Sequence, residues 1–409
     1  MADTTHGTTG SSIAALADQC VMCGLCLPHC PTYRLDRHEA ESPRGRISLA
    51  RQLESGQLPA SAATIAHLDH CLGCLSCQAV CPSQVRYDDI LIQTRALLAP
   101  MRPRPGLLAR WLSRPGLLGR LGAFSAAVSA DRWLPGLSRL FPGGSTLRRL
   151  AAETPRAPAP IPRWRRMPKP DPVRGRLTLF PGCVASVFDR DSLAAGRQLL
   201  EALGYEVATP QEPVCCGALA LHAGESQQAL ATAQATTRAL EACGASTVLV
   251  SASGCIGSLR DHSLRGSALK VADILGFLAA DPAIETLSFR PLPGRAALHL
   301  PCTQISAADG AGPIRALLNR IPGLELLELP AQPRCCGAAG RYFIDQPERA
   351  DRLRSERLGQ IVELAPDWTL STNVGCRIFL GNGLRQTGSK VPILHPLTLL
   401  ARQLEFAQP

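Results

Sequence analysis

The sequence lacks the signals of a secreted or membrane-spanning chain. Residues 1–12 are polar, with neither the basic start nor the apolar run of a signal peptide. No apolar run approaches the roughly 18 to 20 residues that cross a bilayer. No G-x-G-x-x-G pattern follows an expected strand either, so a dinucleotide-binding fingerprint is missing. We therefore expect a cytoplasmic protein that begins with a disordered segment over residues 1–12 and keeps its thiols reduced.

Positive charge is concentrated in one segment. Residues 100–176 contain 16 Arg and Lys against three acidic residues, and 13 of the 34 prolines. This composition predicts a basic, Pro-rich linker over residues 100–175, with short apolar helices such as LLARWL and LLGRLGAF. Three interpretations stay open: a linker packed on the protein's own surface, a contact with a membrane surface, or a docking surface for partner subunits. No nucleic acid is expected as a partner, because no reading module is visible.

Cysteine, in contrast, is abundant, with 17 in 409 residues. Two stretches, Cys20–Pro31 and Cys71–Pro82, each read C-x-x-C-x-x-C-x-x-x-C-P. This run is typical of [4Fe–4S] ferredoxins, in which the fourth cysteine of each run ligates the other cluster. The expected ligands are therefore Cys20, Cys23, Cys26 and Cys81 for one cluster, and Cys71, Cys74, Cys77 and Cys30 for the other.

Zinc and disulfides explain these runs less well. Zinc sites usually combine two C-x-x-C pairs that lie far apart in sequence, not four cysteines in one run. Disulfides need an oxidising compartment, and no secretory signal precedes the motifs. The two runs therefore predict a protein that carries electrons.

The residues around the two runs are helical in pattern, unlike the small β-rich bacterial ferredoxins. Ser42-Pro43 predicts the start of an amphipathic helix, residues 58–70 predict another that ends at Cys71, and Tyr87–Ala99 predicts a closing helix. We expect an α-helical ferredoxin domain with two [4Fe–4S] clusters over residues 13–99, similar to the all-helical ferredoxin of succinate dehydrogenase iron–sulfur subunits.

From Arg176 onward the chain repeats itself. The repeats match at Cys183/Cys302, Cys215/Cys335, Cys216/Cys336 and Cys255/Cys376, with offsets of 119 to 121 residues. Each copy alternates strands and helices around a Cys-Cys-Gly triplet, which predicts duplicated α/β domains over residues 176–290 and 291–409 in a pseudo-twofold relation. We expect the segments after Cys255 and Cys376, LKVADILGFLAA and VPILHPLTLLARQ, to be packing helices.

The repeat cysteines follow expected strands, and the carboxyl ends of parallel strands meet at one edge of a sheet. Four thiols would then converge in each copy. They could bind a further Fe–S cluster or zinc, act as redox-active thiol pairs, or be structural. Cys243 is the one cysteine left over, and we expect it to be a packed small hydrophobe. His395, Arg341 and Tyr342 are expected to be structural or surface residues, and no catalytic residue is assigned.

Two ferredoxin runs followed by two Cys-Cys-Gly domains resemble the iron–sulfur subunit of glycolate oxidase (glycolate dehydrogenase). The resemblance extends nearly end to end, apart from the linker. Heterodisulfide reductase subunits share the architecture but end each repeat in C-x-x-C, whereas Cys255 and Cys376 have no such partner. The motifs that carry the resemblance are CPTYRL (30–35), SPRGRI (42–47), LDHCLGC (68–74), CPSQVRYDDI (81–90), CCGALALH (215–222), ASGC (252–255), PCT (301–303), CCGAAGRY (335–342) and TNVGC (372–376).

The resemblance implies a division of labour between subunits. A partner FAD subunit would oxidise glycolate or D-lactate, giving glyoxylate from glycolate, and a second flavoprotein-like subunit would complete the complex. This chain would pass the electrons towards quinone or the respiratory chain, in the cytoplasm or on the cytoplasmic face of the inner membrane. The alternatives are a stand-alone disulfide or quinone reductase, an iron–sulfur subunit for another 2-hydroxy acid or for glycerol 3-phosphate, and a redox-sensing assembly protein.

Overall fold

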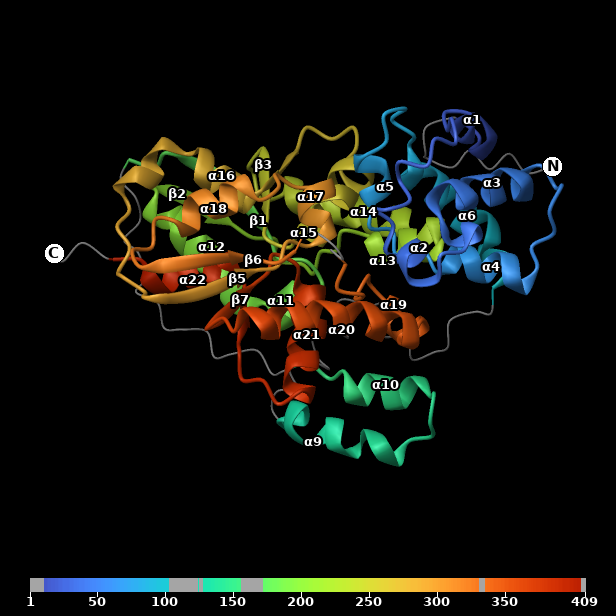
Figure 1. Ribbon diagram of the computed structural model, residues 1–409. Coiled ribbons are helices and arrows are strands. Elements are labelled where there is room, and N and C mark those ends of the chain that lie inside the picture. The colour runs from blue at the N-terminus through green and yellow to red at the C-terminus, as the bar shows by residue number, and fades with distance from the viewer. Residues whose placement is uncertain (1–10, 103–123, 125–127, 156–171, 331–334, 406–409) are drawn as a thin grey trace.

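The computed structural model describes residues 11–102, 124, 128–155, 172–330 and 335–405. Residues 11–102 form a helical domain without strands, as predicted. Figure 1 shows this domain beside two α/β units that follow it in the chain. Its helices are α1 (Ile13–Ala17), α2 (Pro31–Asp36), α3 (Pro43–Glu54), α4 (Ala62–Asp69), α5 (Ser76–Ala79) and α6 (Tyr87–Leu98).

Serine caps fix where two of these helices begin. The Ser42 hydroxyl accepts a hydrogen bond from the Gly45 amide, and Pro43 supplies the first residue of α3 with a φ that suits a helix. The Ser61 hydroxyl accepts a hydrogen bond from the Thr64 amide at the start of α4. The expected helix over residues 58–70 was therefore too long at its N-terminal end, because the cap at Ser61 starts it at Ala62.

A buried ion pair holds the helical domain together. Arg46 and Glu41 each expose only 2% of their side chains and lie 2.6 Å apart, Nη2 to Oε2. Arg46 also donates to Thr32 Oγ1 at 3.0 Å and to the His67 carbonyl at 2.7 Å. Burial alone would raise the pKa of Glu41, but hydrogen bonds from His70 and His67, together with the charge of Arg46, lower it to about 2.

Each repeat contains one parallel sheet of four strands, in the orders β2-β1-β3-β4 and β6-β5-β7-β8. In both sheets the strand order reverses between the first and third strands, which is where α/β folds place ligands. The strands are β1 (Gly175–Phe180), β2 (Tyr205–Ala208), β3 (Thr247–Val250), β4 (Lys270–Asp273), β5 (Gly294–Leu298), β6 (Leu324–Glu328), β7 (Trp368–Leu370) and β8 (Ile393–Leu394).

The last strand of each sheet corrects the sequence prediction. The segments expected to be only packing helices begin with β4 and β8 and become helical afterwards, as α16 (Ile274–Ala280) and α22 (Pro396–Gln403). Asp273 caps α16 and His395 caps α22, each accepting a hydrogen bond from the amide two residues later. Both strands are short and lie at a sheet edge, so their apolar residues did not stand out from those of the following helix.

The two α/β units share one hydrophobic core. Helix α12 (Arg190–Ala202) of the first unit packs against α22 of the second, and α18 (Gly312–Leu318) of the second packs against α16 of the first. This reciprocal packing agrees with the expected pseudo-twofold relation. Polar pairs cross the same boundary: Arg377 forms an ion pair with the fully buried Asp189, and the Gln304 amide donates to Asp273 at 2.7 Å.

Two helices of the basic segment lie within the described residues. Helices α9 (Ala130–Leu137) and α10 (Thr146–Ala152) run together on one side of the second unit, away from both sheets (Figure 1). Arg149 of α10 contacts Asp351 through both terminal nitrogens, at 2.9 and 2.8 Å. Glu153 is buried and accepts a hydrogen bond from Arg354 at 2.8 Å. The predicted LLARWL and LLGRLGAF helices lie outside the described residues, except for Phe124.

Between residues 11 and 405, as far as the chain is described, no helix is long and apolar enough to cross a lipid bilayer.

The Glu41 network predicts a large and pH-dependent loss of stability for Glu41→Gln. The substitution leaves Arg46 buried without its carboxylate, which costs about 3 to 5 kcal/mol of unfolding free energy. Because the pKa of Glu41 is lowered from 4.5 to about 2 in the folded protein, its stabilisation is fully present above about pH 4.5 and is lost as the pH falls towards 2.

Thermal unfolding of the anaerobic protein at matched scan rates measures the effect. We expect Glu41→Gln to unfold at a lower midpoint temperature than the original protein. The difference between the two midpoints should be constant from about pH 8 to 5.5 and should become smaller below about pH 4.5. Glu39→Gln is the control, since its ion pair with Arg44 is half exposed and costs about 0 to 1 kcal/mol to lose. Equal midpoints for the two variants would contradict the account.

Candidate functional site

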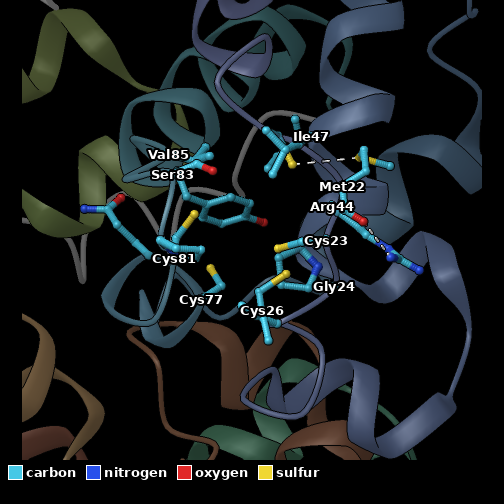
Figure 2. A pocket seen from close by; sticks show the side chains of 17 residues that line it. Met22, Cys23, Gly24, Cys26, Arg44, Ile47, Cys77, Cys81, Ser83 and Val85 are labelled. Carbon is cyan, nitrogen blue, oxygen red and sulfur yellow. Dashed lines mark hydrogen bonds between the residues drawn. The ribbon is translucent and has the colours of Figure 1, made fainter.

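The two cysteine runs of the helical domain meet as crossed sets. The first hollow is lined by all three leading cysteines of the first run and the last cysteine of the second, which are Cys20, Cys23, Cys26 and Cys81, and also by Cys77. Figure 2 shows the labelled Cys23, Cys26, Cys77 and Cys81 around the same space. We call Cys20, Cys23, Cys26 and Cys81 the first set.

The second hollow has the complementary lining: Cys30 of the first run with Cys71, Cys74 and Cys77 of the second. We call these four residues the second set. None of the eight thiols is in a disulfide. Each set has four thiols, the number of cysteine thiolates that holds a [4Fe–4S] cluster, and Cys77 of the second set lines both hollows. The geometry thus brings together the cysteines that the sequence grouped, while their assignment as ligands stays a prediction.

Left-handed backbone at matching positions turns successive thiols towards one point. The residue before the second cysteine of each run has positive φ, 56° at Met22 and 61° at Gly73. The residue after the second cysteine also has positive φ, 82° at Gly24 and 55° at Leu75. Glycine adopts this conformation without cost, whereas Met22 and Leu75 do so at some strain. Positive φ at the same two positions of both runs, with one non-glycine residue in each run, fits a loop shaped around a bound group.

Positive charge and a hydroxyl surround these thiols. Arg44 donates to the Met22 carbonyl at 2.9 Å, and Arg95 to the Cys71 carbonyl at 2.6 Å. The Arg46 guanidinium lies 3.9 Å from Cys30 Sγ, and the buried Tyr87 hydroxyl lies 3.4 Å from Cys71 Sγ. Burial raises the pKa of the Cys77 thiol well above its usual value. Binding of a metal must therefore displace its proton, and the nearby arginines favour the resulting negative charge.

The four cysteines of the first repeat converge after the strands of its sheet. Cys183 follows β1, Cys215 and Cys216 follow β2, and Cys255 lies in α15 (Ser253–Ser258), after β3. The Cys183 and Cys215 sulfurs are 3.5 Å apart. Hydrogen bonds from the Cys183 and Cys216 thiols lower the pKa of Cys215 to about 3. A thiolate among neighbouring thiols is a set of donors suited to a soft metal or to thiol chemistry.

The four cysteines of the second repeat are more deeply buried than those of the first. Cys335, Cys336 and Cys376 are buried, and Cys302 is half-buried. Cys336 and Cys376 lie 2.8 Å apart, Sγ to Sγ, and this contact lowers the pKa of Cys336 well below its usual value. The pKa of the Cys302 thiol is raised by its hydrogen bond with Cys335 and by burial.

The sequence analysis missed one residue here, His299. It follows β5 and is completely buried, and one of its ring nitrogens lies in a group with the Cys336 and Cys376 sulfurs whose atoms are all within 4.8 Å of one another. The available signal was the motif HLPCT (299–303), in which His299 lies three residues before Cys302. Burial lowers the pKa of His299, so that its imidazole is neutral.

The second set of the helical domain packs directly against the second repeat. Leu72, between Cys71 and Cys74, belongs to the same buried cluster as Cys335, Cys336 and Cys376, and Cys74 packs against that cluster. Helix α5, which carries Cys77, contacts α17 (Cys302–Ser306). The second set therefore lies between the first set and the thiols of the second repeat.

Three further candidates are structural. His67, His70 and Glu41 have metal-ligand chemistry, but Arg46 and Arg349 face the same carboxylate and disfavour a cation there. Cys243 is buried and donates to the Ala239 carbonyl, as expected for a packed thiol. His395 is buried between the Ser251 carbonyl and the Leu397 amide, which confirms its structural role.

Comparison with known families gives the same division of the chain into one helical domain and two α/β units. The model of the 4Fe-4S dicluster domain matches residues 16–85. The model of the cysteine-rich domain matches twice, over residues 177–260 and 296–381. The fold is thus an α-helical ferredoxin domain followed by duplicated cysteine-rich α/β domains.

Similar proteins cover almost the whole chain. The glycolate oxidase iron–sulfur subunit of Escherichia coli (strain K12) is 30% identical over 94% of both chains. The probable glycolate oxidase iron–sulfur subunit of Bacillus subtilis (strain 168) is 28% identical over 93% of this chain and 92% of its own. Lactate utilization protein A of Macrococcus caseolyticus is 28% identical, over 56% of this chain and 98% of its own. The end-to-end match, with thiol sets at every expected position, shows that the chain belongs to the family of glycolate oxidase iron–sulfur subunits.

Proposed function

We propose that this chain is the electron-transfer subunit of a 2-hydroxy-acid dehydrogenase complex, with glycolate as the first candidate substrate and D-lactate as the second. A partner FAD subunit oxidises glycolate to glyoxylate, and this chain passes the electrons towards quinone or the respiratory chain. The observation that carries the proposal is the row of neighbouring thiol sets in a member of this family. Such sets suit one-electron carriers placed close together.

The first set would hold one [4Fe–4S] cluster and the second set the other. When bound, these clusters supply the uptake and release of single electrons. The chain's own part is to fix the thiols in position and to offset their charge. Arg46 does both, because it lies beside Cys30 and is tied to Glu41 and Thr32. Tyr87 shields Cys71 from water and directs its hydroxyl at the sulfur.

The loop of the first set offers a contact surface for a redox partner. Val21, Met22 and Leu25 expose 68%, 49% and 57% of their surface, and Cys23 is exposed among them. Apolar side chains around an exposed thiol suit a transient electron-transfer interface, which is small and buries the redox group from water. We propose that the flavin subunit or the acceptor docks here, while the second set passes electrons inside the chain.

Purification from the native host tests the function. The tagged protein is isolated anaerobically and assayed for flavin absorbance and for dye reduction with glycolate, D-lactate and glycerol 3-phosphate. We expect a flavoprotein in the eluate and dye reduction by glycolate, since the proposal requires a partner that takes the hydride. A protein that elutes alone with its clusters intact would contradict it and favour a stand-alone reductase acting through the repeat cysteines.

Leu25→Glu sharpens the same experiment. A carboxylate in the apolar loop costs desolvation at the interface, so we expect the rate of cluster reduction by substrate to fall at least tenfold. Reduction by dithionite, which needs no docking, stays unchanged. Leu230→Glu is the matched control, because Leu230 is 59% exposed on α14 (Ser226–Glu241). An equal fall of the reduction rate in both variants would show that the loop is not the docking surface.

We further propose that α9, α10 and their connection touch an anionic membrane surface. Trp133, Leu137 and Leu140 expose 47%, 43% and 78% of their surface. Arg139 and Arg148 are exposed in the same region. Apolar side chains beside arginines are the composition that binds the interface of an anionic bilayer. This position would keep the chain near a quinone pool.

Flotation with vesicles of phosphatidylglycerol and phosphatidylcholine measures this contact. We expect the full chain to float with the vesicles at low salt, and to float less at high salt because salt screens the charges. The Trp133→Glu variant should stay at the bottom of the gradient. Leu230→Glu, on α14, is again the control and should float like the original chain. If Trp133→Glu floats as well as the control, the membrane contact is wrong and docking to a partner subunit is favoured.

A further inference from the structure

The buried imidazole of His299 is not accounted for by packing. Its side chain is 0% exposed, and neither ring nitrogen has a hydrogen-bond partner of normal geometry in the described part of the chain. Leaving a buried polar group without a hydrogen bond is unfavourable. The backbone around it is ordinary, since the His299 amide donates to the Leu370 carbonyl at 2.9 Å and continues the sheet. The cost therefore belongs to the side chain alone.

What faces the imidazole is sulfur. The group formed by His299, Cys336 and Cys376 has its donor atoms within 4.8 Å of one another, and all three residues are buried. Cys335 belongs to the same buried cluster as Cys336 and Cys376, and Cys302 is hydrogen-bonded to Cys335. A buried, neutral imidazole aimed at thiols is a donor set that iron and zinc accept, and that hard cations such as magnesium do not.

The first repeat lacks this imidazole. The offset of 119 residues between Cys183 and Cys302 places Phe180 opposite His299, and Phe180 is buried at the end of β1. The aromatic ring of the first repeat thus fills the space that an imidazole occupies in the second. Four thiols remain in the first repeat, while the second repeat has four thiols and one nitrogen donor. The duplication has kept the cysteines and changed this one position.

We propose that His299 is a metal ligand, so that the second repeat holds an iron or zinc centre with mixed imidazole and thiolate ligands. Cys336 and Cys376 are its nearest partners, and Cys302 and Cys335 supply the remaining thiolates. The site is distinct from the two ferredoxin sets and does not require the proposed electron-transfer partner.

Metal analysis of the full-length protein tests the proposal with two variants. His299→Phe reproduces the first repeat and fills the same space, so it should fold and retain the ferredoxin clusters, with about eight irons per chain. We expect it to lose all the metal that the original protein holds at this site, seen as zinc or as iron beyond those eight. His299→Cys offers a thiolate in place of the nitrogen and should retain that metal with an altered spectrum.

Spectroscopy distinguishes the two metals and detects the nitrogen directly. For zinc, X-ray absorption should show a nitrogen neighbour at about 2.0 to 2.1 Å that is absent in His299→Cys. For iron, double-resonance spectra of protein labelled with ¹⁵N-histidine should show a coupled nitrogen that the ferredoxin sets cannot supply. His395→Gln is the control, since His395 is a buried histidine with its hydrogen bonds made, and it should keep the metal. Metal content that is unchanged in His299→Phe, or no metal beyond the ferredoxin clusters in the original protein, would overturn the proposal.

Discussion

The burial of Arg46 beside two cysteine runs is the constraint on which the helical domain depends. A guanidinium with 2% exposure is tolerable only when its hydrogen bonds are made and its charge is balanced. Glu41 supplies the charge, while Thr32 and the His67 carbonyl accept further hydrogen bonds. These contacts join the segment after the first run to the helix before the second. The same guanidinium stands beside Cys30, where it offsets the charge of a thiolate.

The position of the remaining thiols follows from the shared core of the two repeats. Each parallel sheet directs its strand ends to one edge, and the reciprocal packing of α12 on α22 and of α16 on α18 fixes the two edges relative to each other. The second edge lies against Leu72 and Cys74 of the helical domain. The helical ferredoxin domain and the duplicated α/β unit are thereby packed together, with their thiol sets next to each other. Cys23 is the exposed member of this body of thiols, in the loop of the first set.

Much of this arrangement was predictable because it depends on short-range rules. The spacing of the cysteine runs predicted the crossed grouping of Cys30 and Cys81, and the offsets of 119 to 121 residues predicted two α/β copies. The edge strands β4 and β8 were missed because four and two residues, respectively, give too little periodicity to separate them from the helices that follow. His299 was missed for a different reason. A histidine after a strand is common, and this one is set apart by a tertiary property: among the described residues its ring nitrogens have no hydrogen-bond partner of normal geometry.

The central claim is that the crossed cysteine sets hold two neighbouring [4Fe–4S] clusters. The most direct measurement is electron paramagnetic resonance of the fully reduced protein, together with iron and labile sulfide counts, for the original chain and for Cys81→Ser. The account predicts two clusters whose spins interact, and a change in Cys81→Ser at the cluster of Cys20, Cys23 and Cys26, not at that of Cys71, Cys74 and Cys77. Zinc in place of iron, or a change confined to the cluster of the second run, would contradict it.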